Sequence, residues 1–296
     1  MISIFQGIAT IVGCMLLQQP IATCTPSGLA DAPEQHAQVA IPKKTGAAID
    51  VDLTAQSALV WDITTGTILY DRNADTERPI ASLNKLLSTV VARSLISPDA
   101  TVTIPQDVIK AQHEGVGIKL IPGEHFAARD LFEASLIPSA NDAMVSLAVA
   151  TKGSESAFVD YANTYASSHG LFHTLLANST GLQEGVQHST ARDVMHLLMN
   201  AYSDSFLRPF LSQQKGEIIS EEGHTHTFIS TDQLLGTYMP ILAAKTGYTL
   251  AAKENLAIIT VGPKGQKIGA VILGSDDRFQ DMKTVVEYTY RNYTWP

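Results

Sequence analysis

Ser82 and Lys85 are the residues of this sequence whose types and spacing most directly suggest chemistry. If a helix begins at Ser82, Lys85 follows three residues later, so the two side chains share one face and their tips can meet. Leucine and valine residues surround Lys85 on nearly every side of that helix, which is typical of a helix inside a core. Burial lowers the pKa of a lysine, so Lys85 could accept a proton from the Ser82 hydroxyl near neutral pH. The competing interpretation is a serine that caps the helix and a lysine that extends to solvent.

Two further clusters contain groups that such a serine would need. Ser139 and Asn141 lie between two predicted helices, where a hydroxyl could relay a proton and an amide could hold a carbonyl group. Lys245, Thr246 and Gly247 end a predicted strand, and a lysine, a hydroxyl and a glycine there suit an extended peptide that ends in a carboxylate. Each cluster alone is equally consistent with a helix cap or a strand end. The ordered series S-x-x-K, S-x-N and K-T-G indicates one common site.

Composition limits the classes of protein that this chain can represent. Of its 296 residues, 45% are hydrophobic and 17% are charged, which suits a sizeable core rather than a membrane bundle. The net charge of -9 argues against nucleic acid or anionic lipid as the main partner. The only cysteines are Cys14 and Cys24, so a chain processed after them contains no thiol for redox chemistry, metal binding or catalysis.

The N-terminal segment has the composition of an export signal. Residues 1–24 are mostly apolar and are expected to be a signal peptide or membrane anchor, although no basic residue precedes Lys43. Lipid attachment at Cys14 or Cys24 is a minor alternative. Residues 25–48 read as a flexible linker, and residues 49–296 as the folded domain. We therefore expect a periplasmic or extracytoplasmic protein that contacts a membrane only through this segment, if the segment is retained.

Sequence patterns predict strands at both ends of the domain and helices between them. The predicted strands lie at 57–62, 67–71, 225–230, 240–245, 255–261 and 267–273. The predicted helices begin at Ser82 and at 127, 141, 157, 192 and 276. The expected fold is α/β of the α+β kind. It has an antiparallel five-stranded sheet flanked by helices, with an all-helical subdomain at about 82–215 inserted between the sheet-forming segments.

The order and context of the three motifs are similar to those of the penicilloyl serine transferases, which include penicillin-binding proteins and serine β-lactamases. From about Val51 onward, the sequence resembles the D-alanyl-D-alanine carboxypeptidases and endopeptidases of peptidase family S11, the low-molecular-mass penicillin-binding proteins. The stretches that carry this resemblance are RPIASLNKL, LIPGEHFAARDLFEASLIPSANDAM, NSTGL with HSTARDV, and AAKTGYT. The resemblance implies a β-lactamase/transpeptidase-like fold and a serine DD-peptidase that requires no metal or organic cofactor.

The resemblance also implies a role for each motif. Ser82 would attack the carbonyl between two D-alanines of a peptidoglycan stem peptide, Lys85 would accept its proton, and water would hydrolyse the acyl-enzyme. β-Lactam antibiotics would acylate the same serine and inhibit the enzyme. The backbone N–H groups of Ser82 and Tyr248 would form the oxyanion hole.

The remaining motif residues would bind and align the substrate. Ser139 and Asn141 would relay protons and align the peptide. Lys245 and Thr246 would hold its carboxylate, next to Gly247. The chain departs from the family after K-T-G-Y-T, where Ala251, Ala252, Lys253 and Glu254 replace a small-residue turn that commonly ends in glycine.

Several alternatives follow from the same residues. A class A β-lactamase would need E-x-x-L-N, but Glu184 is followed by Gly185 and Val186, so a penicillin adduct should be hydrolysed slowly. A catalytically inactive wall-binding homologue is disfavoured because every motif residue is present. The compact length makes an endopeptidase acting on cross-links as plausible as a carboxypeptidase. His224 and His226 share a strand face, and we expect two exposed histidines rather than a metal pair.

Overall fold

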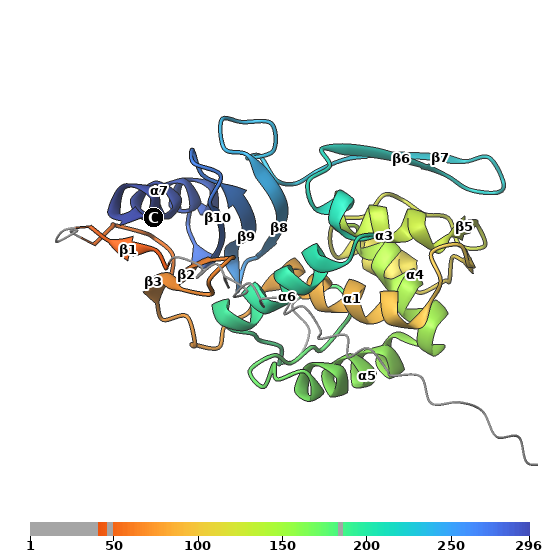
Figure 1. The fold of residues 1–296 in the computed structure, drawn as a ribbon. Helices are drawn as coiled ribbons and strands as arrows, with labels where there is room; N and C mark the ends of the chain where they lie inside the picture. The colour runs from red at the N-terminus through yellow and green to blue at the C-terminus, as the bar shows by residue number, and fades with distance from the viewer. Residues whose placement is uncertain (1–40, 46–49, 183–185) are drawn as a thin grey trace, which may run out of the picture. The chain divides into compact units, whose positions relative to one another are not determined.

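A five-stranded antiparallel sheet, in the order β3-β2-β10-β9-β8, forms the centre of the fold (Figure 1). The computed structural model describes residues 41–45, 50–182 and 186–296, so the predictions for residues 1–40 and for Glu184 lie outside the described residues. The strands of this sheet are β2 (Ser57–Asp62), β3 (Ile68–Arg72), β8 (Ile241–Thr249), β9 (Lys253–Val261) and β10 (Lys267–Ser275). The prediction that strands from both ends of the domain share one antiparallel sheet is confirmed, because β2 pairs with β10.

The alternation of side chains along each strand divides the core into two layers. Val60 and Ile258 pack in a cluster with Met282 of α7 (Arg278–Asn292), which covers one face of the sheet. Their neighbours Leu59 and Ile259 belong to the other cluster, beneath α6 (Ala191–Ser203) and α1 (Lys85–Leu95). Adjacent residues of a strand point to opposite faces, so a run that is apolar throughout fits a sheet covered on both sides.

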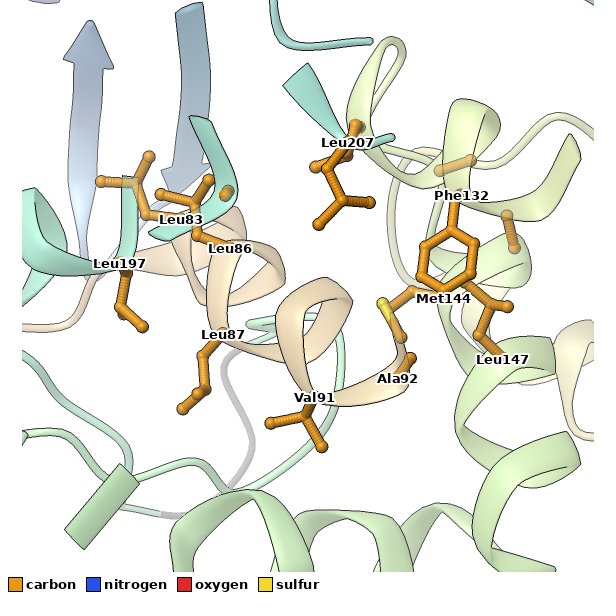
Figure 2. Packing of buried hydrophobic residues seen from close by; sticks show 14 of the residues in the cluster. Leu83, Leu86, Leu87, Val91, Ala92, Phe132, Met144, Leu147, Leu197 and Leu207 are labelled. Atoms are coloured by element: carbon orange, nitrogen blue, oxygen red, sulfur yellow. The ribbon is translucent and has the colours of Figure 1, made fainter. Parts of the chain in front are cut away.

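The segment between β3 and β8 is mainly helical, and α1 lies at its centre. A 3₁₀ helix, η1 (Ala81–Asn84), leads directly into α1. Figure 2 shows Leu83, Leu86, Leu87 and Val91 of these elements with apolar side chains of the surrounding helices. The other helices are α2 (Val108–His113), α3 (Ala128–Leu136), α4 (Asn141–Lys152), α5 (Glu155–Ser168) and η2 (Arg208–Leu211). Lys85 is thereby enclosed in the core, as its position among leucines predicts.

The expectation of an all-helical insertion is wrong in one respect. A short two-stranded sheet of β4 (Thr101–Thr103) and β5 (His125–Ala127) lies within it. Three-residue strands are too short to give a clear alternation, which is why the sequence does not reveal them. The predicted strand near Thr225 is present as β7 (Thr225–Ile229), but it pairs with β6 (Lys215–Ile219) outside the main sheet.

The ends of the described domain also pair with each other. β1 (Lys43–Lys44) and β11 (Tyr293–Thr294) form a two-stranded antiparallel sheet. In the part of the chain that the structure describes, we find no helix that is both long and apolar enough to cross a membrane.

Candidate active site

Ser82 and Lys85 lie within hydrogen-bonding distance of each other, as their spacing predicts. Lys85 Nζ is 3.0 Å from Ser82 Oγ, 2.7 Å from Asn141 Oδ1 and 2.9 Å from the carbonyl oxygen of Thr180. Ser82 lies in η1 rather than in the first turn of an α-helix, and no side chain caps the N-terminal end of η1 or of α1. The interpretation of Ser82 as a cap is therefore wrong. Ala81, immediately before it, has φ +49°, a region that costs a non-glycine residue energy and that is concentrated at functional sites.

The surroundings of Lys85 favour its neutral form. Burial lowers its pKa well below the ordinary value of a lysine, and the charge of Lys245 lowers it further. The carboxylates of Asp142 and Glu155 act in the opposite direction but do not outweigh burial. The three hydrogen-bond partners of Nζ are a hydroxyl, an amide oxygen and a backbone carbonyl, none of which carries a charge. A neutral amine in this position can accept a proton from Ser82.

Ser139 and Asn141 meet the other motifs at the start of α4. Lys245 Nζ donates to Ser139 Oγ at 2.7 Å, while Asn141 reaches Lys85. Neither side chain caps α4, whose N-cap position is Ala140 and has no side-chain hydrogen bond. Ser139 has φ +67°, again a costly conformation for a residue other than glycine. The Asn141 backbone N–H donates to the Val116 carbonyl at 2.7 Å, which fixes the start of the helix.

The K-T-G segment lies on β8 directly against the serine. A Cβ atom on Gly247 would be 2.7 Å from the Ile80 carbonyl oxygen and 3.1 Å from the Ser82 nitrogen, so only glycine permits this approach. Lys245 is buried, and burial together with the nearby Arg278 lowers its pKa to about 7. β8 is an edge strand, so one of its two sides pairs with no other strand of the five-stranded sheet.

A cavity of about 750 Å³ opens beside Ser82. Its wall includes Asn141 and Tyr248, and the side chain of Tyr248 is largely exposed. The remaining lining residues are Glu114, Gly115, Val116, Leu182, Thr249, Leu250 and Ala251. The cavity is within the size range of small-molecule and peptide sites.

Two contacts of the site could not be found by motif. The Thr180 carbonyl, within the NSTGL stretch, accepts a hydrogen bond from Lys85. Arg278, the first residue of α7, donates from Nη1 to the Gly247 carbonyl at 3.1 Å. The only sequence signal for Arg278 is its position at the start of the last helix, where Asp277 caps the N-terminus. Thr180 and Arg278 are both distant in sequence from the residues that they contact.

The turn after K-T-G-Y-T keeps the strand pairing despite its unusual sequence. Thr249 pairs with Lys253 across the turn, so β8 and β9 remain in register. Lys253 has φ +55°, the left-handed conformation that favours glycine, and its ammonium group is 2.7 Å from Asp276. A lysine therefore occupies a backbone conformation for which glycine would be the usual residue.

The prediction that His224 and His226 are both exposed is wrong for His226, which is 8% exposed. A carboxylate also lies between them, since Glu124 Oε1 is 2.8 Å from His224 Nδ1 and 3.1 Å from His226 Nε2. Glu124 comes from a distant segment, so sequence spacing could not show this contact. Among residues 41–45, 50–182 and 186–296, no group of three or more His, Cys, Asp or Glu side chains is arranged to hold a metal ion.

Comparison with known proteins identifies the family. The sequence model of peptidase S11, described as D-alanyl-D-alanine carboxypeptidase, matches residues 42–277. The chain belongs to this family. As an S11 peptidase it is a serine-type hydrolase of the D-alanyl-D-alanine carboxypeptidase and endopeptidase group.

Individual S11 relatives cover most of the domain. A D-alanyl-D-alanine endopeptidase of Pseudomonas aeruginosa is 33% identical over 226 residues, which are 74% of this chain and 71% of the relative. The D-alanyl-D-alanine carboxypeptidase DacF of Bacillus subtilis is 25% identical over 246 residues, 81% of this chain but only 63% of that relative.

Solved structures confirm the predicted fold of this S11 peptidase. The crystal structure of a D-alanyl-D-alanine carboxypeptidase from Mycobacterium tuberculosis superposes with a TM-score of 0.77 at 23% identity, covering 84% of this chain and 96% of that one. The Streptomyces K15 DD-transpeptidase superposes with a TM-score of 0.76 at 24% identity, covering 82% and 100%. The β-lactamase/transpeptidase-like arrangement of a five-stranded sheet and helices is therefore shared.

Proposed function

We propose that Ser82 is the acyl-ester nucleophile of a D-alanyl-D-alanine peptidase and that Lys85 is its general base. The observation that carries this proposal is the 3.0 Å contact between Ser82 Oγ and the buried Nζ of Lys85. Lys85 takes the hydroxyl proton as the Oγ–C bond to the substrate carbonyl forms. Collapse of the tetrahedral intermediate then breaks the C–N bond, and the leaving amine takes up the proton that Lys85 accepted, so Lys85 is neutral again. Water then attacks the ester carbonyl, Lys85 accepts a proton from this water and returns it to Ser82 Oγ as the ester bond breaks.

The backbone N–H groups of Ser82 and Tyr248 stabilise the oxyanion in this proposal. The close packing of Gly247 against Ser82 supports it, because it holds the backbone of the next residue beside the nucleophile. Such donors act where charge develops in the transition state, and removal of one typically costs about 10²- to 10³-fold in rate.

The K-T-G side of the cleft binds the carboxylate of the leaving D-alanine. Lys245, Thr246 and Arg278 supply donors and positive charge there, and Arg278 Nε is a buried atom that has no hydrogen-bond partner among the described residues. Ser139 Oγ, which accepts a hydrogen bond from Lys245 at 2.7 Å, passes a proton to the departing amine. Asn141, whose Oδ1 accepts a hydrogen bond from Lys85, aligns the peptide. This arrangement suits an extended peptide along the edge of β8.

The substrate that fits this chemistry is a peptidoglycan stem peptide ending in D-Ala-D-Ala, or the corresponding bond within a cross-link. The names of the relatives, both carboxypeptidases and endopeptidases, support this substrate class. β-Lactams act as inhibitors by acylating Ser82. Since the cell wall lies outside the cytoplasmic membrane, we place the enzyme on the extracytoplasmic side.

Substitution of Ser82 by alanine should abolish covalent labelling by fluorescent penicillin and hydrolysis of stem peptides, because no nucleophile remains. Ser94→Ala is the matched control, since the Ser94 hydroxyl donates to the Val91 carbonyl within α1. Labelling is read by gel, and products from pentapeptides and cross-linked dimers are resolved by mass. Equal labelling of Ser82→Ala and wild type, or no labelling of folded wild type, would exclude this function. Rapid turnover of nitrocefin by the wild type would indicate a β-lactamase instead.

Binding of a peptide with a free C-terminal carboxylate should weaken as the pH rises through about 7, the pKa of Lys245. Below that pH the lysine is cationic and attracts the carboxylate. Above it the lysine loses its proton, so KM should increase by up to about tenfold per pH unit. The measurement is the ratio of KM values for the peptide and for its C-terminal amide, which cancels the effect of Lys85 on the chemical step. A ratio independent of pH would show that Lys245 does not bind the carboxylate.

A further inference from the structure

In the binding mode proposed above, the cavity beside Ser82 would receive the part of the substrate upstream of the attacked carbonyl. Along β8, Lys245 precedes Gly247, which packs against Ser82, and the cavity wall continues through residues 248–251 in the other direction. Lys245 does not line this cavity. If the C-terminal carboxylate is bound at Lys245, the residues before the penultimate D-alanine extend into the cavity. At about 750 Å³, it is far larger than the methyl group of an alanine requires.

Among the described residues that line this cavity, Glu114 is the only acidic or basic side chain apart from the tyrosine. The side chains of Val116, Leu182 and Leu250 make much of the remaining surface apolar. Glu114 follows the last turn of α2, and its side chain is 39% exposed. The ammonium group of Lys110, one helical turn earlier, is 4.0 Å from the Glu114 carboxylate. This is a long distance for an ion pair, and the Lys110 side chain is 64% exposed to solvent. Such a contact leaves a carboxylate able to pair with a cation that enters the cavity.

Carboxylates outnumber basic side chains among the described residues at this end of the cleft. A small neighbouring cavity is lined by Glu114 and Lys110 together with two more carboxylates, Asp107 and Glu155. Glu155 is occupied, because its Oε1 accepts hydrogen bonds from the backbone and the hydroxyl of Ser179. Acidic side chains therefore outnumber basic ones at this position, which favours a positively charged ligand group.

We propose that Glu114 selects peptides in which the residue before D-Ala-D-Ala carries a free amine on its side chain. This inference rests on the proposed function, because it uses the direction in which the substrate lies along β8. A bound peptide displaces water from the apolar part of the cavity, so an ammonium–carboxylate pair there is stronger than one on an open surface. An acylated amine carries no charge and gains nothing from Glu114.

The test compares D-alanine release from two peptides that differ only in this charge, Nα-acetyl-L-lysyl-D-Ala-D-Ala and its Nα,Nε-diacetyl counterpart. The wild type should prefer the free amine by about threefold to tenfold in kcat/KM. Glu114→Gln should bring this ratio close to one, mainly by raising KM for the free-amine peptide, and Glu114→Lys should reverse the preference. Asp160→Asn is the matched control, since it removes an exposed carboxylate of α5 that lines neither of these two cavities. It should keep the wild-type ratio.

Labelling by fluorescent penicillin shows whether each variant retains a folded site. Equal kcat/KM for the two peptides in the wild type would overturn the role of Glu114 and leave the proposed function standing. A preference that persists in Glu114→Gln would overturn it as well. If the folded wild type releases D-alanine from neither peptide, the proposed function fails and this inference fails with it.

Discussion

Replacement of Lys85 by arginine should lower the second-order rate constant of acylation by penicillin by about 10²- to 10⁴-fold, the contribution of a positioned general base. The environment of Lys85 lowers its pKa, so the lysine can be neutral and accept the Ser82 proton. Arginine remains charged under all ordinary conditions and cannot accept a proton. The rate is followed by mass spectrometry of the acyl-enzyme, and circular dichroism shows whether the variant is folded.

A matched substitution separates this chemistry from a general effect of arginine. Lys152→Arg alters a lysine at the end of α4 whose ammonium group lies 4.2 Å from the centre of the Tyr161 ring, and it should acylate at the wild-type rate. In the wild type, acylation should slow as the pH falls, because protonation of Lys85 removes the base. A folded Lys85→Arg enzyme that acylates within a factor of a few of the wild type would show that another group takes the proton.

Contacts that are local in the chain could be predicted from sequence. Ser82 and Lys85 are three residues apart, so helical geometry alone brings their tips together, even though the first turn is a 3₁₀ helix. The strand at Ser57–Asp62 agrees with its apolar pattern, and α6 begins at Ala191, one residue before its predicted start, where Thr190 Oγ1 accepts from the Asp193 N–H. In these cases, the interactions that determine the structure lie within a few residues.

Among contacts between distant segments, the resemblance to a family predicts those that join the three motifs, but not those made by Thr180 and Arg278. The Thr180 carbonyl is 95 residues from Lys85, and Arg278 is 31 residues from Gly247. No periodicity or composition specifies such contacts, because they depend on how the sheet and the helices pack. The same reason applies to His226, which is buried beside Glu124, 102 residues away in the chain.

Gly181→Ala should both destabilise the fold and slow acylation, because a methyl group there would overlap the backbone before Ser82. Gly181 has φ +86°, and a Cβ atom would be 2.1 Å from the Ala81 carbonyl oxygen. Conformational strain and displacement together should lower the free energy of unfolding by about 3–5 kcal/mol. The neighbouring Thr180 carbonyl would shift away from Lys85, and a misplacement of about 1 Å can cost about 10²-fold in rate.

Gly223→Ala isolates the contribution of backbone conformation. Gly223 has φ +87°, almost the same as Gly181, but a Cβ atom added there would meet no atom of the described residues within 4 Å. In Gly223→Ala the free energy of unfolding should fall by only about 1–2 kcal/mol, because the backbone strain is present without the overlap. This variant should be acylated at the wild-type rate. Urea denaturation and penicillin acylation measured on both variants give the comparison. If both variants lose the same stability and the same acylation rate, the approach of Gly181 to Ala81 does not position the nucleophile. If Gly181→Ala loses more of both, the difference is due to that contact.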